Sequence, residues 1–213
     1  MSTDAAPEPG SAGEHLLQDK YGTQDRAEKF YTEQLLDTLT PRMIEFLGRQ
    51  TQMIIATADA DGHPDASVRF GEPGFVVALD DRTVTWPELR GNGVMTSLGN
   101  LVKNAWTHLM FLDAEQRIGL HLRGQSTIVE APVMVADHPD IANRPSTGRA
   151  PERWVIMRLE SSYIHCRKHF PRADAPVDWG TDDVRAKGGD YFGAAGTASP
   201  WAAHKASGQR CDT

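Results

Sequence analysis

The sequence has little cysteine, no long hydrophobic run and no excess of basic residues. Only two cysteines occur in 213 residues, Cys166 and Cys211, which excludes a disulfide framework. No run of about 18 apolar residues is present, so we expect no membrane-spanning segment. The 29 acidic residues outnumber the 22 basic ones and give a net charge of −7, whereas a nucleic-acid binder needs a basic face. We therefore expect a protein that binds neither membrane nor nucleic acid.

The two ends of the chain differ in composition from its centre. Residues 1–13 are mainly Ala, Pro, Gly, Ser and acidic residues, without the basic start and apolar segment of a secretory signal. We expect this tail to be disordered, because it has almost no apolar residues to bury. Because no secretory signal is recognisable, we expect a cytoplasmic location. After residue 172 Ala, Gly, Asp and Lys become frequent. The expected parts are a tail over 1–13, one domain over 14–171 and an irregular extension over 172–213.

The centre of the chain has the pattern of short strands with a few helices. Amphipathic spacing predicts helix within 14–37, and Thr40 followed by Pro41 predicts a second helix start. A helix is expected over 96–104 and a loop over 136–150. Strands are expected over 51–58, 64–70, 74–79, 83–86, 105–113, 117–135 (with a break near Gly124) and 153–166. This order favours a mainly β, α+β fold: a small antiparallel barrel with a helical N-terminal segment and a short inserted helix.

Four segments follow one another in an order that is specific only as a whole. They are PRMIEFLGRQTQMIIATADADGHPDASVRFG (41–71), VVALDDRTVTW (76–86), GNGVMTSLGNLVKNAWTHLMFLD (91–113) and RGQSTIVE (123–130). This series resembles the pyridoxamine 5'-phosphate oxidase-like family of flavin-binding split barrels. The resemblance implies an antiparallel split β-barrel that forms a homodimer and holds flavin mononucleotide (FMN) in the cleft between the two barrels.

The strand over 64–70 is the first part of the expected cofactor site. In the family this strand lies along the flavin and its phosphate, and Ser67, Val68 and Arg69 fall at the matching positions. The Arg69 guanidinium would then donate a charge-assisted hydrogen bond to the phosphate or to a ring oxygen. The alternative is an ion pair between Arg69 and an acid such as Glu72 or Asp65.

The segment over 91–104 is the second part. The Gly-Asn pair that contains Asn92 precedes a helix start at Thr96 and Ser97, and a helix N-terminus attracts anions. Pyridoxamine-phosphate oxidases proper carry an Arg-Lys pair at the positions of Thr96 and Ser97, so two phosphate-binding cations are missing here. Side chains that could replace them are Arg69, Arg90, Lys103 and Arg123. The alternative is that Thr96 and Ser97 form an ordinary helix cap.

The strand that begins at residue 117 supplies the remaining expected cofactor residues. In the family a polar or basic side chain from this strand reaches the flavin ring, and His121 and Arg123 are the residues available. The alternative is a solvated strand face. Trp106 is expected in the core. The spacing of His165 and His169 suggests metal binding at first, but a structural zinc site needs four ligands, so no metal is expected.

Motifs for nucleophilic catalysis are absent, and no catalytic residue can be assigned. A flavin enzyme needs none, because the cofactor carries the hydride chemistry. The leading hypothesis is an FMN-dependent oxidoreductase that acts on an unknown small molecule, with NAD(P)H as a possible electron donor. One alternative is a deazaflavin-dependent reductase, whose acidic cofactor tail would need a basic channel. Another is a non-catalytic protein that binds flavin or haem.

Overall fold

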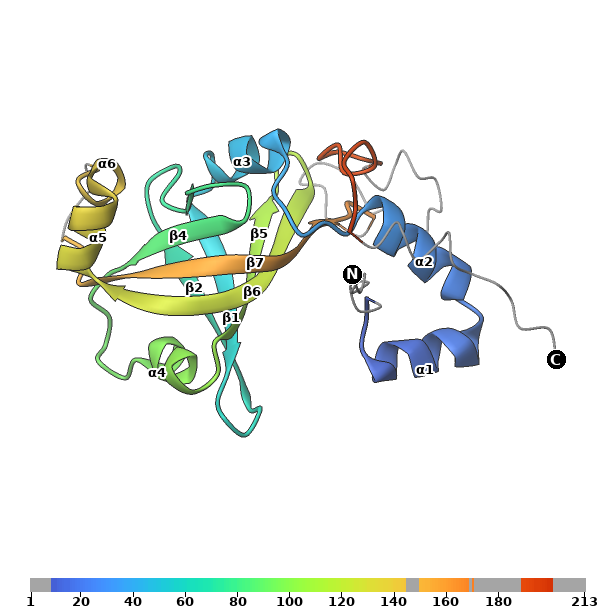
Figure 1. Cartoon of the computed structure of the whole chain (residues 1–213), viewed down its shortest axis with the longest axis horizontal. Coiled ribbons are helices and arrows are strands. Elements are labelled where there is room, and N and C mark those ends of the chain that lie inside the picture. Colours follow the sequence, from blue (N-terminus) through green and yellow to red (C-terminus); the bar gives the residue numbers. More distant parts are fainter. Residues whose placement is uncertain (1–8, 145–149, 169, 171–188, 201–213) are drawn as a thin grey trace, which may run out of the picture.

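The computed structural model describes residues 9–144, 150–168, 170 and 189–200. Its centre is a seven-stranded antiparallel sheet in the order β2-β1-β5-β6-β7-β4-β3, which curls into a split barrel (Figure 1). The expected antiparallel split-barrel architecture is thus confirmed. The strands are β1 (Gln52–Ala58), β2 (Pro64–Phe70), β3 (Val77–Ala78), β4 (Thr83–Glu88), β5 (Trp106–Asp113), β6 (Ile118–Glu130) and β7 (Arg153–His165).

Alternating side chains give each central strand an inner and an outer face. In β5, Thr107, Leu109 and Phe111 are buried inside the barrel, whereas Trp106 and His108 lie on the outer face. The other central strands also contribute buried apolar side chains to one continuous core. The expectation that Trp106 is a core residue is therefore wrong: its side chain is on the outer face and 42% exposed.

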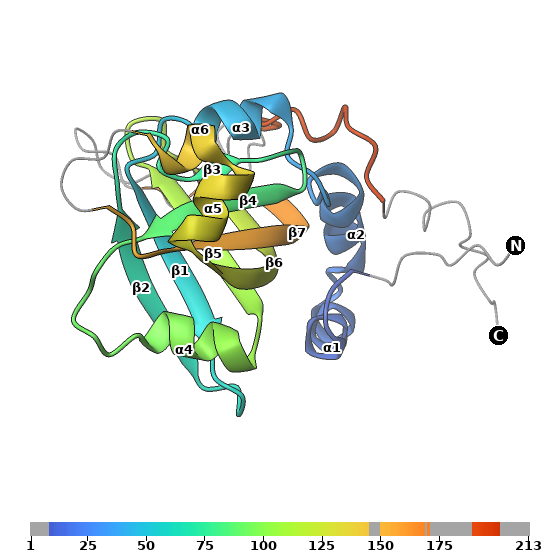
Figure 2. The same cartoon turned by 60° about the vertical axis from the view of Figure 1, so that its left-hand side comes forward.

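The helices cover the ends and edges of the barrel. They are α1 (Ala12–Tyr21), α2 (Gln24–Glu33), α3 (Pro41–Leu47), α4 (Thr96–Lys103), α5 (Ala131–Asp137) and α6 (Pro139–Ala142). α3 begins where expected, with Thr40 Oγ1 accepting a hydrogen bond from the Met43 N–H at 3.2 Å. α1 and α2 project beyond one end of the barrel (Figure 2). Among the described residues, no helix combines the length and apolar character needed to cross a bilayer.

Some expected boundaries are wrong. β6 runs without interruption to Glu130, with a bulge at Arg123 and Gly124, and the chain then forms α5 and α6 where strand and loop were expected. Pro132 lies in the first turn of α5, a position that proline favours. The strand expected over 74–79 is reduced to two residues, because Gly74 takes a positive φ of 78° and donates its N–H to the Gln50 carbonyl.

The expected ends of the domain are only partly described. α1 begins at Ala12, two residues earlier than expected, since Ser11 and Glu14 form a reciprocal capping box at its start. Residues 1–8 of the expected N-terminal tail lie outside the described residues. So do 171–188 and 201–213 of the expected extension. The described part at 189–200 packs back on the barrel through Phe192, whose ring lies 5.2 Å from that of Phe46.

Candidate functional site

A cavity of about 580 Å³ lies beside the start of α4, and we call it the α4 pocket. β2, the end of β4, the loop after β4 and the first turn of α4 form its walls. It brings together six of the eight residues expected to bind the cofactor: Ser67, Val68, Arg69, Asn92, Thr96 and Ser97. The β1–β2 hairpin and the packing of α4 on β1 create this arrangement. They bring residues that are about 30 positions apart in the sequence to the wall of one cavity.

Arg69 is paired inside the α4 pocket with an acid that sequence reasoning did not identify. Its Nε lies 3.0 Å from Glu88 Oε1, and its Nη1 donates to Ser67 Oγ at 2.7 Å. Glu88 also accepts a hydrogen bond from the indole N–H of the fully buried Trp86 at 3.1 Å. This network joins β2 to β4 across the opening of the sheet. Arg69 thus forms an ion pair, as in the alternative considered above, but with Glu88 instead of Glu72 or Asp65.

The first turn of α4 faces the same pocket without a side-chain cap. The N-cap residue is Met95, in the left-handed conformation with φ of 57°, and it makes no capping hydrogen bond. The backbone N–H groups of this turn are therefore available to an anion. Ser97 Oγ lies 3.4 Å from Asp65 Oδ2, so one carboxylate is close to this helix end.

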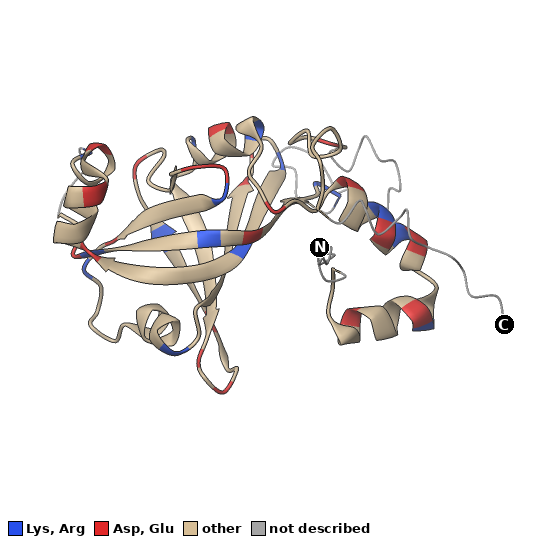
Figure 3. Cartoon of the chain, viewed as in Figure 1, with Lys and Arg blue, Asp and Glu red and all other residues tan. Residues whose placement is uncertain are grey.

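The charges around the α4 pocket balance one another. Its lining holds three carboxylates (Asp65, Glu88, Glu152) and three guanidinium groups (Arg69, Arg90, Arg153). Figure 3 shows that charged residues are sparse on the strands of the barrel compared with α1 and α2. Arg90 is exposed and forms no ion pair with any described residue, whereas Arg69 and Arg153 are both paired. Arg90 is consequently the cation most available to an anionic ligand.

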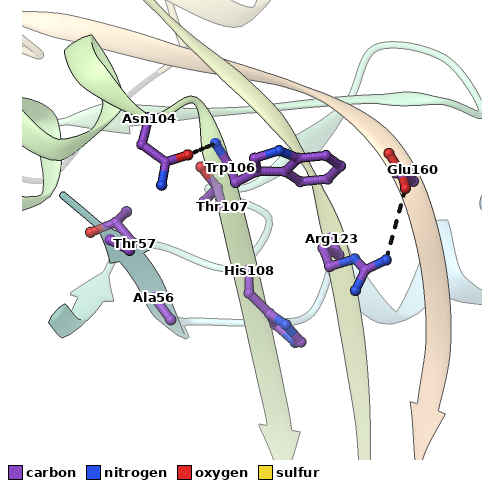
Figure 4. A pocket seen from close by; sticks show the side chains of 9 residues that line it. Ala56, Thr57, Asn104, Trp106, Thr107, His108, Arg123 and Glu160 are labelled. Carbon is purple, nitrogen blue, oxygen red and sulfur yellow. Dashed lines mark hydrogen bonds and ion pairs between the residues drawn. The ribbon is translucent and has the colours of Figure 1, made fainter. Parts of the chain in front are cut away.

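The structure places the other two expected residues on the outer face of the sheet, away from the α4 pocket. Arg123 lines a second, more open cavity of about 440 Å³ together with Trp106, His108 and Glu160 (Figure 4), which we call the outer pocket. Its guanidinium lies 5.8 Å from the centre of the Trp106 ring and 3.8 Å from Glu160. His121 lies next to this pocket, in hydrogen-bond contact with His108.

His108, His121 and His165 form a chain on the outer face that we call the histidine row. His108 Nε2 lies 2.8 Å from His121 Nδ1, and His121 Nε2 lies 3.0 Å from His165 Nδ1. Burial, and less strongly the nearby Arg123 charge, lowers the pKa of His108. Burial, followed by the charges of His108 and His165, lowers the pKa of His121 to about 3. His169, considered above as a metal ligand with His165, lies outside the described residues.

Sequence reasoning missed Glu88 and His108. Glu88 ends a strand and has no motif around it, so only the approach of β2 to β4 reveals its role. His108 had a detectable signal: in an alternating strand it falls on the same face as Trp106, opposite the apolar Leu109. The alternation predicts on which face of the strand His108 lies. It does not predict the hydrogen-bond partners of His108, because the other histidines come from β6 and β7.

The family model for pyridoxamine 5'-phosphate oxidase matches residues 39–161, more than half of the chain. This chain belongs to the pyridoxamine 5'-phosphate oxidase family. The matched range contains the α4 pocket and the histidine row except His165, so both lie almost entirely within the family's shared domain. No curated protein matches the sequence.

Several solved structures are similar to this chain at low sequence identity. A variant of HupZ from Group A Streptococcus is 22% identical, with a TM-score of 0.47, covering 60% of this chain and 99% of that one. The FAD binding protein from Mycobacterium smegmatis is 18% identical, with a TM-score of 0.41 and coverage of 60% and 95%. A Clostridium acetobutylicum protein related to general stress protein 26 is 15% identical, with a TM-score of 0.39 and coverage of 65% and 89%.

Proposed function

We propose that this family member binds FMN in the α4 pocket and acts as a flavin-dependent oxidoreductase. The observation that carries the proposal is the uncapped first turn of α4 beside Arg90, which forms no ion pair within the described part of the chain. Backbone N–H groups at a helix start and a free guanidinium together suit a phosphate group. Thr96 adds a hydroxyl donor in the same turn, and the Ser97 hydroxyl, which donates to Asp65, lies beside it. The carboxylates of Glu88 and Asp65 repel a phosphate, and the two cations found in pyridoxamine-phosphate oxidases proper are missing. The residues that would hold the phosphate are therefore the first turn of α4 and Arg90, without a strong excess of positive charge around them.

Apolar side chains around the same pocket suit the ring of the cofactor. Leu89 and Met95 line the pocket and are 46% and 49% exposed, and Val68 on its β2 wall is 46% exposed. Covering such side chains with a planar aromatic ring removes apolar surface from water. The pocket thus combines an anion-binding end with an apolar rim, which is the combination that a phosphorylated ring requires. A bound flavin supplies hydride and electron transfer, while the protein orients it.

We also propose that two copies of the chain form the working unit. Large apolar side chains are exposed on the outer surface of β2 and β5, among them Phe70 at 67% and Trp106 at 42%. Burying them against a second copy would be favourable and would close the open side of the pocket. The substrate would then be a small molecule that enters this seam, and NAD(P)H is the proposed electron donor.

The proposal is tested by comparing FMN with riboflavin, which has the same ring without the phosphate. Titration of the full chain, followed by quenching of flavin fluorescence, should show tighter binding of FMN. Arg90→Ala should weaken FMN binding about tenfold or more, because a charge-assisted hydrogen bond contributes about 1.5–3 kcal/mol. The same variant should leave riboflavin binding unchanged. Lys103, considered above as a replacement cation, lies in the last turn of α4 and does not line the α4 pocket. Lys103→Ala is therefore the matched control and should bind FMN as the wild type does.

Four results would contradict the proposal. Equal affinity for FMN and riboflavin would show that the pocket has no phosphate-binding site. If neither compound binds, the protein is not a flavin-binding protein. Binding of a deazaflavin with an acidic tail, in place of FMN, would support the reductase alternative. If the protein binds no flavin but shows a Soret band on addition of haem, the result would support the haem-binding alternative. If FMN binds, bleaching by NADPH and reoxidation by an acceptor would distinguish an enzyme from a carrier.

A further inference from the structure

Three histidines from three neighbouring strands meet on the outer face of the barrel. In the β5–β6 and β6–β7 registers, His108 is paired with Arg123 and His165 with Gly119, so both are diagonal neighbours of His121. Diagonal neighbours lie within reach of aromatic side chains. Gly119 leaves the room that this requires, since a Cβ there would lie 2.9 Å from the Cβ of His165.

Both ring nitrogens of His121 are engaged within the histidine row. Its Nδ1 lies 2.8 Å from His108 Nε2 and its Nε2 lies 3.0 Å from His165 Nδ1. The ring also stacks on Tyr163, with centroids 4.6 Å apart and planes 9° apart, which holds its orientation. These bonds form one unbranched chain of imidazoles that runs from β5 to β7.

We propose that the histidine row is a proton relay between the outer pocket and solvent. The inner end is His108, which lines the outer pocket and whose Nδ1 has no hydrogen-bond partner among the described residues. The outer end is His165, whose side chain is exposed. An imidazole suits this role because it accepts a proton on one nitrogen while releasing one from the other.

Each transfer conserves the number of protons. At the start each ring is neutral and carries its proton on Nε2, so every Nε2–H donates to the next Nδ1. A proton that arrives on His108 Nδ1 makes the Nε2 proton of His108 pass to His121 and that of His121 pass to His165. The Nε2 proton of His165 then leaves to water. All three rings end as Nδ1–H tautomers, and passage of one proton in the opposite direction restores the first state.

The surroundings keep His108 and His121, the two inner rings of the row, neutral. Arg123 on β6 opposes a positive charge on His108, and desolvation lowers the pKa of both inner histidines. Among the described residues, the other ionisable groups near the row are Glu160 and Tyr163 on β7 and Glu14 on α1, whose charge acts on Tyr163. Burial raises the pKa of Tyr163, so this phenol stays protonated. A proton on the inner rings is therefore short-lived and passes on.

The test measures exchange of the ring N–H protons with water in the protein without added cofactor. Histidine labelled with nitrogen-15 allows NMR to follow His108 and His121 individually. His165→Asn retains a hydrogen-bonding group near the position of Nδ1 but cannot pass a proton through its amide. We expect exchange at His121 to slow about 100-fold in this variant, the lower end of what a positioned proton-transfer group contributes. His63→Asn, an exposed histidine on the β1–β2 turn, is the control and should leave exchange unchanged.

A second variant separates proton transfer from a structural role of His165. His165→Ala should also slow exchange, and free imidazole added to this variant should restore it by occupying the vacated space. His165→Asn should not respond to imidazole. Unchanged or faster exchange in His165→Asn, or no rescue of His165→Ala, would overturn the relay. None of these measurements uses flavin, so the relay can fail while FMN binding stands, and FMN binding can fail while the relay stands.

Discussion

The α4 pocket and the histidine row show two different ways of keeping polar groups inside or against one barrel. In the α4 pocket, Arg69 and Glu88 both carry charge and neutralise each other at 3.0 Å. In the histidine row, His108 and His121 are neutral because burial disfavours their charged forms. Removing one partner should therefore leave an uncompensated charge in the first region and only a missing hydrogen bond in the second.

The comparison also separates binding from proton transfer. A pocket of paired charges holds a charged ligand only if the ligand competes with the existing pairs, which makes affinity depend on Glu88 and Asp65. A row of neutral imidazoles that hydrogen-bond one another is suited to passing a proton. If both proposals hold, one face of the β1–β2 hairpin holds the cofactor and the outer face of the sheet exchanges protons with water.

The largest expected effect comes from removing Glu88. Glu88→Ala leaves the Arg69 guanidinium and the buried Trp86 N–H without their acceptor, so the free energy of unfolding should fall by about 3 kcal/mol. Urea denaturation followed by tryptophan fluorescence measures the change. Glu130→Ala is the control, because its ion pair with Arg153 is 3.7 Å long and its side chain is 67% exposed, and it should cost less than about 1 kcal/mol. An equal loss of unfolding free energy in the two variants would show that the Arg69–Glu88 pair stabilises the protein no more than an exposed ion pair does.

Glu88→Gln sharpens the same comparison. The amide oxygen can still accept the Trp86 N–H, whereas the charge that neutralises Arg69 is gone. FMN should therefore bind more tightly while the protein becomes less stable, and riboflavin affinity should not change. Tighter binding of both flavins, or of neither, would contradict the placement of the phosphate in the α4 pocket, where the Glu88 carboxylate opposes it.

A smaller effect is expected at the bulge in β6. A Cβ on Gly124 would run into the backbone carbonyl of Arg158, which cannot move without breaking the β6–β7 ladder. Gly124→Ala should destabilise the protein by about 2 kcal/mol. Gly99→Ala is the control: no atom lies within 4 Å of its added Cβ, and alanine favours the α4 helix. Thermal unfolding distinguishes the two, and a neutral Gly124→Ala would mean that the bulge relaxes freely.

The last effect, no larger than the one at the bulge, concerns pH and tests the neutral state of His121. The pKa of His121 is about 3 in the folded protein and about 6.5 in the unfolded chain, so the unfolded state binds more protons as the pH falls. Stability is consequently lost as the pH falls from about 6.5 toward 3, with about 2 kcal/mol lost between pH 7 and pH 5. His121→Phe should remove this part of the pH dependence, measured by urea denaturation at several pH values. His63→Phe controls for loss of an exposed imidazole. An unchanged slope in His121→Phe would show that His121 binds a proton as readily in the folded protein as in the unfolded chain.

Much of the fold could be predicted because its signals are local. The expected strands at 51–58 and 64–70 agree with Gln52–Ala58 and Pro64–Phe70, since the Asp-Gly turn and the period-two pattern both lie within a few residues. The helix starts after Thr40 and near Thr96 were also found from capping and glycine signals. The segment after Glu130 was missed, because short apolar runs such as residues 131–135 fit a strand as well as a helix.

The sequence by itself determined the acidic composition, the alternation of faces along each strand, the family and the six residues that meet in the α4 pocket. Only the tertiary structure decided which charges and rings pair. Glu88 reaches Arg69 because the sheet curls until β2 approaches β4, and the three histidines meet because two strand registers place them on one diagonal. Such pairings depend on contacts between residues far apart in the chain, and no local pattern encodes them.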